Sequence, residues 1–512
     1  MRQSTKIYCL LPLIAFIMLT LQSCTVNPVT GKRELSFYST DSQIRMGEQN
    51  YIPGQQSQGG PYYLDQNLNA YIERVGKKLA AVSDVPDLPY EFVVLNNGVP
   101  NAWAMPGGKI AINRGLLVEL EDEAELAAVL GHEIVHAAAA HGASQLSRGT
   151  LFGIGSTVAA IAGSQTEQGG LIAQGAQAGA AAWSASYGRS DELESDEYGM
   201  LYMSRAGYDP KGAIELQKTF VELSGGRQTD FITGLFASHP PSQSRVDANI
   251  KTAANLPAGG FRGRNEYQAA IAQIKKDEAA YDAETRAIQA LNDKNPQEAI
   301  KQLDAAIAVQ PNDGHFWELR GHAWQMQGNN DNALQAFSTA ISKNENYYRH
   351  WLSRGLLNKQ IGKSQAAESD FVRSQSLLPN AVSAFNLGEL AEARGDTETA
   401  IGYYSQVASA GGDIGTAAQT KLVRYELPSN PSKYLASGFF LSQQGELVAV
   451  VENRSGVPVS NVTVNVVSRE TGKSLQLPVR GTIDPGQQAS ARTGFKGDPN
   501  NYAVSVIKAS VN

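Results

Sequence analysis

A repeat with a period of about 34 residues organises the chain over residues 280–412. Trp317 and Trp351 lie one period apart, and the same spacing separates three more pairs of identical residues: Gly321 and Gly355, Gly328 and Gly362, and Phe337 and Phe371. Small residues at a fixed period let paired helices approach closely, while aromatic rings fill the gaps between them. The period therefore predicts a stack of helix pairs.

Two further units extend this repeat on either side. The earlier unit has residues in phase at Ala299, Leu303, Ala306 and Pro311, and the later one, shortened by a single position, at Gly388, Gly395, Ala400 and Tyr404. About four units at this period predict an α-solenoid of tetratricopeptide repeats over residues 275–415. Because a solenoid presents a concave surface suited to extended segments, we expect it to bind a protein partner. The alternative is an array that serves packing alone.

The size and charge of the chain limit the remaining possibilities. At roughly 100–200 residues per domain, 512 residues predict about three domains. The formal net charge of −7 argues against a nucleic-acid partner, because phosphate contacts require clustered Lys and Arg.

Residues 1–23 have the pattern of a signal peptide. Arg2 and Lys6 precede an apolar run from Ile7 to Leu21, which is too short for a comfortable transmembrane helix. Leu21-Gln22-Ser23-Cys24 is similar to a lipobox, which predicts lipidation of Cys24 and a membrane lipid anchor. Since Thr25 is not an Asp, we expect a periplasm-facing outer-membrane lipoprotein. A plain secretory signal and a soluble periplasmic protein are the alternative.

The rest of the chain divides by composition. Residues 24–60 are polar and predict a tether, residues 61–260 a peptidase domain, and residues 435–512 a small β-sandwich. Within the second segment we expect helices over 65–83 and Glu121–Ala140, and strands over Tyr90–Leu95 and Lys109–Ile112. The Gly/Ala-rich residues 149–183 predict either a helical hairpin or a flap over a cleft. The predicted fold is mainly α, with an α+β zincin-like domain.

The motif His132-Glu133-Ile134-Val135-His136 lies inside the second predicted helix. Residues four apart on a helix share a face, so two imidazoles at this spacing can hold one Zn²⁺ and leave room for a third ligand and a water. Glu133 lies one step around the helix, where it can act as general base on that water. Two core histidines beside a surface Glu are the alternative interpretation.

The third ligand must come from elsewhere in the chain. On the predicted helix His141 is about 140° away from the ligand face, which favours a structural or capping role. The acidic residues 191–196 offer Glu192 and Asp196 on one helix face, so one could bind the metal while the other orients a ligand His. By spacing alone, Glu194 competes with Glu192, and a solvated acidic face is the alternative.

Three motifs carry a resemblance to a known family. They are residues 101–108 (NAWAMPGG), residues 114–117 (RGLL) and residues 125–136 (ELAAVLGHEIVH). Together they resemble the HtpX-like, CaaX-prenyl-protease-like zinc metallopeptidases, and most closely the BepA-like periplasmic proteases, which join such a domain to tetratricopeptide repeats. The resemblance covers about residues 24–255 and 280–412. The membrane helices of the prenyl-protease branch are missing, and the β-rich C-terminus lies outside the BepA-like plan.

The resemblance implies roles for five residues. The family's Glu-x-x-x-Asp motif falls on Glu192 as a metal ligand and Asp196 as its supporting residue. The His-Pro…Arg motif falls on His239 and Arg245, which implies that they border the metal and stabilise the oxyanion or bind substrate. In BepA-like proteins this His can also reach the zinc and hold the enzyme latent. Asn101 matches a family Asn near the substrate strand.

These features predict an endopeptidase of the bacterial cell envelope with one Zn²⁺ per chain. Its expected substrates are misfolded or stalled envelope proteins, including outer-membrane β-barrel precursors. A substrate strand would add to a sheet edge near Lys109–Ile112, and the repeats would recruit the substrate or the outer-membrane assembly machinery. The alternative is an assembly chaperone or scaffold whose zinc site is structural or latent. A third possibility is a processing protease with a single substrate.

Overall fold

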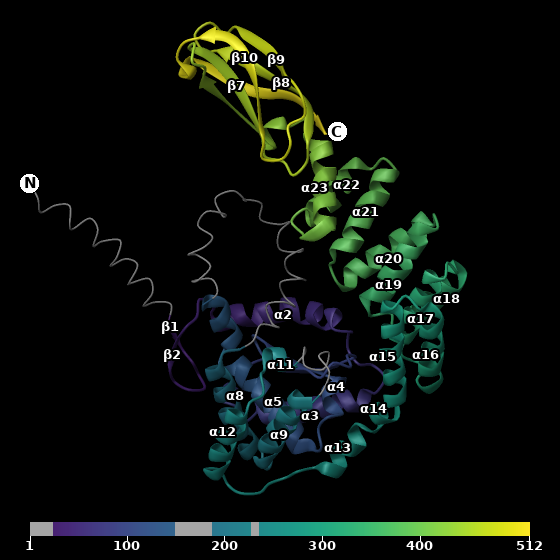
Figure 1. The fold of residues 1–512 in the computed structure, drawn as a ribbon. Coiled ribbons are helices and arrows are strands. Elements are labelled where there is room, and N and C mark those ends of the chain that lie inside the picture. The colour runs from purple at the N-terminus through teal and green to yellow at the C-terminus, as the bar shows by residue number, and fades with distance from the viewer. Residues whose placement is uncertain (1–23, 149–186, 227–234, 512) are drawn as a thin grey trace, which may run out of the picture. The chain divides into compact units, whose positions relative to one another are not determined.

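The computed structural model describes residues 24–148, 187–226 and 235–511 (Figure 1). The expected signal peptide and the segment 149–183 therefore lie outside the described residues. The chain forms two compact units that meet in sequence between Gly362 and Lys363. The predicted class of mainly α structure, with an α+β domain, helical repeats and C-terminal strands, is confirmed.

A three-stranded sheet lies at the centre of the first unit. Its strands are β3 (Glu91–Leu95), β4 (Ala102–Met105) and β5 (Lys109–Asn113), in the order β3-β5-β4. β5 pairs in parallel with β3 and antiparallel with β4. The expected substrate edge at Lys109–Ile112 is therefore wrong, because both sides of β5 are already paired. Among the described residues β4 is an edge strand of this sheet.

Helix α5 (Glu123–Ala138) is the central helix, and all of its residues are buried. It begins where the Asp122 carboxylate accepts a hydrogen bond from the backbone N–H of Glu125 at 3.1 Å, which caps the helix. The sheet and three other helices surround it, namely α3 (Gln66–Ala80), α8 (Arg189–Arg205) and α9 (Lys211–Gly226). Because every face of α5 packs against protein, its polar side chains must find partners inside the domain.

The N-terminal residues are folded, which corrects the expectation of a tether over 24–60. β1 (Cys24–Val26) pairs with β2 (Arg33–Leu35), and α2 (Thr40–Ser57) packs on the sheet. The Tyr51 hydroxyl donates a hydrogen bond to the Ile110 carbonyl at 2.8 Å. At Gly47 a Cβ atom would lie 2.1 Å from the Pro106 carbonyl oxygen, so only glycine allows this approach. The polar composition of residues 24–60 did not reveal that they include a helix, α2, with one face that packs on the sheet.

The first repeat helices belong to the same unit as the peptidase domain. After α12 (Gln243–Ala254) follow α13 (Arg264–Ala270), α14 (Ala272–Lys276), α15 (Glu278–Asn292), α16 (Pro296–Val309), α17 (Gly314–Met326), α18 (Asn330–Lys343) and α19 (Tyr348–Gln360). A Cβ at Gly321 would lie 2.5 Å from the Phe337 ring, which is why a glycine recurs opposite an aromatic residue. The predicted close pairing of helices through small residues is confirmed.

The second unit combines the last repeat helices with the C-terminal strands. Its helices are α20 (Ser364–Leu377), α21 (Ala381–Ala393), α22 (Thr397–Val407) and α23 (Gly412–Glu426). One sheet has the order β10-β7-β6 and contains β6 (Leu435–Leu441), β7 (Glu446–Asn453) and β10 (Gln488–Lys496). The other has the order β11-β8-β9 and contains β8 (Val459–Ser468), β9 (Ser474–Val479) and β11 (Tyr502–Val511). Valines from both sheets share one core.

No helix in the described part of the chain is long and apolar enough to cross a membrane.

Candidate metal centre

Helix α5 presents two histidines on one face, as the four-residue spacing predicts. The Nε2 atoms of His132 and His136 lie 3.0 Å apart, and both side chains are buried. Two imidazole nitrogens this close together can coordinate the same cation.

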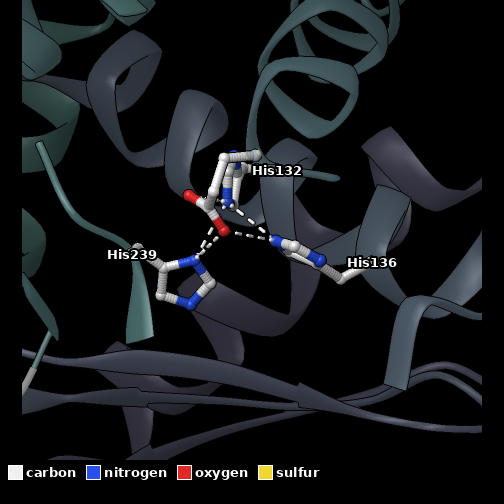
Figure 2. A group of neighbouring side chains, drawn as sticks. His132, His136 and His239 are labelled. Carbon is white, nitrogen blue, oxygen red and sulfur yellow. Dashed lines mark hydrogen bonds and ion pairs between the residues drawn. The ribbon is translucent and has the colours of Figure 1, made fainter. Parts of the chain in front are cut away.

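Two residues from other elements complete the group. Glu192 comes from α8, and His239 follows the short helix α11 (Leu235–Ser238). One ligand atom from each of His132, His136, Glu192 and His239 lies within 4.8 Å of the others. Figure 2 shows the imidazoles of His132 and His136, both from α5, and the imidazole of His239 pointing toward one another. The sequence favoured Glu192 over Glu194 only through the family resemblance, and the structure places Glu192, and not Glu194, in this group.

The donor set fits a zinc ion. Two imidazoles and a carboxylate are the protein ligands of many catalytic zinc sites, which keep a further position open. The Glu192 Oε1 atom is 3.4 Å from His136 Nε2 and 2.9 Å from His239 Nδ1. His239 would therefore occupy the position that a catalytic site leaves open.

A buried ion-pair network holds His132 in place. Its Nδ1 atom lies 2.9 Å from Asp196 Oδ1, and Arg245 on α12 donates two hydrogen bonds of 2.7 Å to the Asp196 carboxylate. Burial alone would raise the pKa of Asp196, but Arg245 lowers it overall. Because Asp196 stays ionised, it keeps the His132 proton on Nδ1 and leaves Nε2 free to bind metal.

Arg245 also reaches the ligand carboxylate. Its Nη1 atom lies 2.8 Å from Glu192 Oε2. Burial would raise the pKa of Glu192, yet the neighbouring His239 and His132 lower it far below its usual range. Both acids of the predicted Glu-x-x-x-Asp motif thus converge on one guanidinium, and Arg245 lies next to the group of candidate metal ligands.

Glu133 is buried beside the ligand group and not part of it. Its Oε1 atom is 3.6 Å from His239 Nε2, and its Oε2 atom has no hydrogen-bond partner among the described residues. Burial raises the pKa of Glu133, and His239 and His132 oppose this shift. A buried carboxylate oxygen without a partner costs free energy, so it is retained where a reaction uses it.

Two residues of the site were missed or misjudged from the sequence. The His141 Nδ1 atom lies 2.9 Å from Nδ1 of His136, although the helical projection placed His141 away from the ligand face. The helix ends at Ala138, and Ala140 has a left-handed φ of 58°, which turns His141 back. The Tyr187 ring stacks on His136 with centroids 3.9 Å apart. No motif in the sequence pointed to Tyr187.

An apolar pocket adjoins Glu133 and His132. Its walls come from α5, α8, α9, α11 and α12 and include Met200, Met203, Leu216, Phe220 and Leu235. Asn101, the predicted substrate-binding residue, directly precedes β4, and its side-chain oxygen is buried without a partner among the described residues. The Leu235 N–H donates a hydrogen bond to the Pro100 carbonyl at 3.1 Å, so the segment that carries His239 meets the chain just before the edge strand.

Comparison with known proteins identifies the domain. Residues 66–253 match the model of peptidase family M48. Residues 66–253 are therefore an M48 metallopeptidase domain. M48 peptidases depend on zinc, which agrees with the predicted zinc and with the four-residue group. Residues 284–347 match a tetratricopeptide-repeat model, which confirms the expected combination of an M48 domain with helical repeats.

Three curated relatives show similar proteins. A putative beta-barrel assembly-enhancing protease of Vibrio cholerae is 29% identical over 231 residues, covering 44% of this chain and 47% of its own. The beta-barrel assembly-enhancing protease of Escherichia coli is 26% identical over 329 residues, covering 58% and 65%. The mitochondrial metalloendopeptidase OMA1 of Schizosaccharomyces pombe is 29% identical over 228 residues, covering 43% and 63%.

The matched segments thus span less than two thirds of each of these three relatives. Among solved structures, the MamA protein is similar to this chain at 18% identity and a TM-score of 0.26. The match covers 28% of this chain and 79% of the MamA chain.

Proposed function

We propose that this chain is a zinc-dependent endopeptidase of the bacterial cell envelope that cleaves misfolded or stalled envelope proteins, including β-barrel precursors. The observation that carries the proposal is the buried Glu133 carboxylate beside the group of His132, His136 and Glu192. A general base has no use in a purely structural metal site.

Zinc, when bound by His132, His136 and Glu192, supplies a Lewis acid that polarises a peptide carbonyl or a water. The protein supplies the proton transfers. The free oxygen of Glu133 accepts a proton from the attacking water and returns it to the leaving amine. Arg245 stays bound to Asp196 and Glu192, and so acts by holding two site residues in register.

The edge strand β4 supports a mode of substrate binding. An extended peptide can pair with its outer backbone groups, which β5 does not use. A peptide on β4 would run next to α5, since β4 and α5 pack together. The adjoining apolar pocket would accept an apolar side chain of the peptide, and Asn101 would offer its unpaired oxygen to the peptide backbone.

The repeats are proposed to recruit the substrate or the outer-membrane assembly machinery. Within the first unit they are joined to the M48 domain by buried polar contacts, such as Asn96 Nδ2 to Asp313 Oδ2 at 3.0 Å. A partner held on the repeats of this unit would therefore be held at a fixed distance from the site. The names of the Vibrio and Escherichia relatives support β-barrel assembly as the process involved.

We further propose that the chain is a periplasm-facing lipoprotein of the outer membrane, with Cys24 as its lipid attachment. This rests on residues 21–24, and a soluble periplasmic protein is the alternative. In the structure Cys24 is the first residue of β1, which pairs with β2. Mass spectrometry of the chain purified from membranes, with Cys24→Ala as control, tests this proposal.

A second candidate function is an assembly chaperone with a latent zinc site. The observation that favours it is His239, whose Nδ1 atom lies 3.2 Å from His132 Nε2 within the ligand group. With all four positions taken by protein, a substrate carbonyl has no place to bind.

The deciding experiment measures cleavage of an unfolded outer-membrane β-barrel protein by four zinc-loaded chains: wild type, Glu133→Gln, His239→Ala and the Glu133→Gln/His239→Ala double variant. Cleavage by wild type or His239→Ala that disappears when Glu133→Gln is added supports the peptidase. Zinc binding without cleavage by any of the four supports the chaperone.

A further inference from the structure

His141 is a buried histidine that the ligand group does not use. Only 1% of its surface is exposed, and its Nδ1 atom faces Nδ1 of His136 at 2.9 Å. The other ring nitrogen of His136, Nε2, faces His132 and Glu192 at 3.0 and 3.4 Å. His136 therefore lies between the ligand group and His141.

A carboxylate lies next to the other ring nitrogen of His141, Nε2. Glu194 Oε1 lies 3.2 Å from His141 Nε2, and Glu194 comes from α8, the helix that also supplies Glu192. The Asn27 side chain donates a hydrogen bond to the same Glu194 oxygen at 2.8 Å. This contact leads from α8 to the N-terminal hairpin.

Asn27 fixes the hairpin formed by β1 and β2. Its side-chain oxygen accepts a hydrogen bond from the backbone N–H of Val29 at 2.9 Å, which shapes the turn between the strands. Its amide nitrogen also donates to Glu34 on β2 at 2.8 Å. Glu34 in turn accepts a hydrogen bond from Ser144, three residues beyond His141, at 3.3 Å. The hairpin is therefore hydrogen-bonded to Glu194 itself and to Ser144, which lies on the segment that carries His141.

These contacts allow one consistent arrangement of protons. If Nε2 of His136 binds a metal, its proton must lie on Nδ1, which then donates to Nδ1 of His141. The proton of His141 must then lie on Nε2, where it donates to the Glu194 carboxylate. Each donor meets an acceptor, and the negative charge of Glu194 favours this arrangement.

We propose that His141 and Glu194 are positioning residues for the metal ligand His136, and that Asn27 in the N-terminal hairpin supports them. The inference rests on the proposed function, because it requires His136 to bind the metal. Asp196 orients His132 directly, whereas Glu194 orients His136 through an intervening imidazole. The metal site is thus connected to the residues that follow Cys24 by successive contacts from His136 to His141, from His141 to Glu194 and from Glu194 to Asn27.

The test is the zinc affinity of the full chain, measured by competition with a chromophoric chelator in the absence of substrate. In His141→Phe a ring of similar size remains but the acceptor is lost, so the Kd for zinc should rise about 10–100-fold. Glu194→Gln and Asn27→Ser should raise it in the same direction by successively smaller factors. Glu197→Gln, an exposed acid on the same helix, is the matched control and should leave the Kd unchanged.

A second readout separates positioning from folding. Cobalt bound in place of zinc should give an altered visible absorption spectrum in His141→Phe and Glu194→Gln, because the orientation of the His136 ring changes. A Kd within twofold of wild type and an unchanged spectrum in Glu194→Gln would overturn the inference, even if the melting temperature of the metal-free chain fell. If His141→Phe does not fold, Glu194→Gln and Asn27→Ser decide. Zinc affinity needs no cleavage, so a chain that binds zinc but cleaves nothing would overturn only the peptidase proposal.

Discussion

The Nδ1 atom of His239 lies 2.9 Å from Oε1 of Glu192, which places an imidazole from outside the His-Glu-x-x-His helix among the atoms that can hold the metal. A backbone hydrogen bond from Leu235 to Pro100 fixes the segment that carries His239 beside the edge strand. The same segment therefore contacts the metal group and the expected path of the substrate.

Replacement of His239 tests whether this imidazole restrains the enzyme. We expect His239→Ala to raise the initial rate of cleavage of an unfolded protein at least several-fold, because a coordination position becomes free for the substrate. The measurement is a fluorescent peptide-release assay on zinc-loaded chains. The double variant with Glu133→Gln should be inactive. A lower rate in His239→Ala, with zinc still bound, would instead make His239 a residue that acts on the substrate.

Arg245 neutralises two buried carboxylates, so its loss should be costly. Arg245→Met leaves Asp196 and Glu192 without their cation, and the free energy of unfolding should fall by about 3–5 kcal/mol. Chemical denaturation of the metal-free chain measures this loss. The comparison variant is Arg205→Met, which breaks the partly exposed pair with Asp84 and should cost less than about 1 kcal/mol. Equal losses in the two variants would contradict the proposed network.

The raised pKa of Glu125 predicts that the stability of the folded chain depends on pH. Burial raises the pKa of Glu125 to about 7 from the usual 4.5, while a hydrogen bond from the Glu121 N–H opposes the shift. The folded chain then binds more protons than the unfolded chain between pH 4.5 and 7, so this group contributes stability at low pH that is lost as the pH rises through 7.

Replacing this carboxyl by an amide should remove that loss. At pH 8 Glu125→Gln should be more stable than wild type, by up to about 3 kcal/mol, and at pH 4.5 the two should match. Thermal unfolding at a series of pH values measures the difference. Glu121→Gln, which changes an exposed acid just before the helix, should show no such pH-dependent gain. A constant difference at all pH values would argue against titration of Glu125.

Arg114 joins the M48 domain to the repeats and should control their attachment. Its guanidinium donates to Asn96 at 2.9 Å, lies 3.2 Å above the Tyr281 ring and pairs with the partly buried Glu284 at 3.2 Å. Arg114→Met removes the charge that opposes a raised pKa at Glu284. The interaction between the M48 domain and the repeats should therefore weaken by about 3–5 kcal/mol.

Limited proteolysis should then release the repeats from the M48 domain earlier than in wild type. Lys301→Met, which breaks an exposed pair within the repeats, is the control and should not change the pattern. If both variants are cut at the same rate as wild type, the attachment of the repeats to the M48 domain does not depend on Arg114.

The sequence by itself determined the repeat and the metal pair. A fixed period that places small residues opposite aromatic ones is satisfied by stacked helix pairs, and Gly321 against Phe337 shows the predicted close approach. Likewise, residues four apart on a helix must share a face, so His132 and His136 converge wherever α5 is placed. Both conclusions depend on local periodicity, which the sequence contains in full.

Tertiary structure decided everything that joins distant segments. Periodicity does not reveal that α8 faces α5, that Tyr187 stacks on His136, or that β4 forms the sheet edge in place of β5. The position of His141 beside His136 was not predicted, because a left-handed residue at Ala140 interrupts the helix on which its projection relied. The polar N-terminal residues fold because Gly47 and Tyr51 find a surface on the sheet, and that surface exists only once the chain has folded.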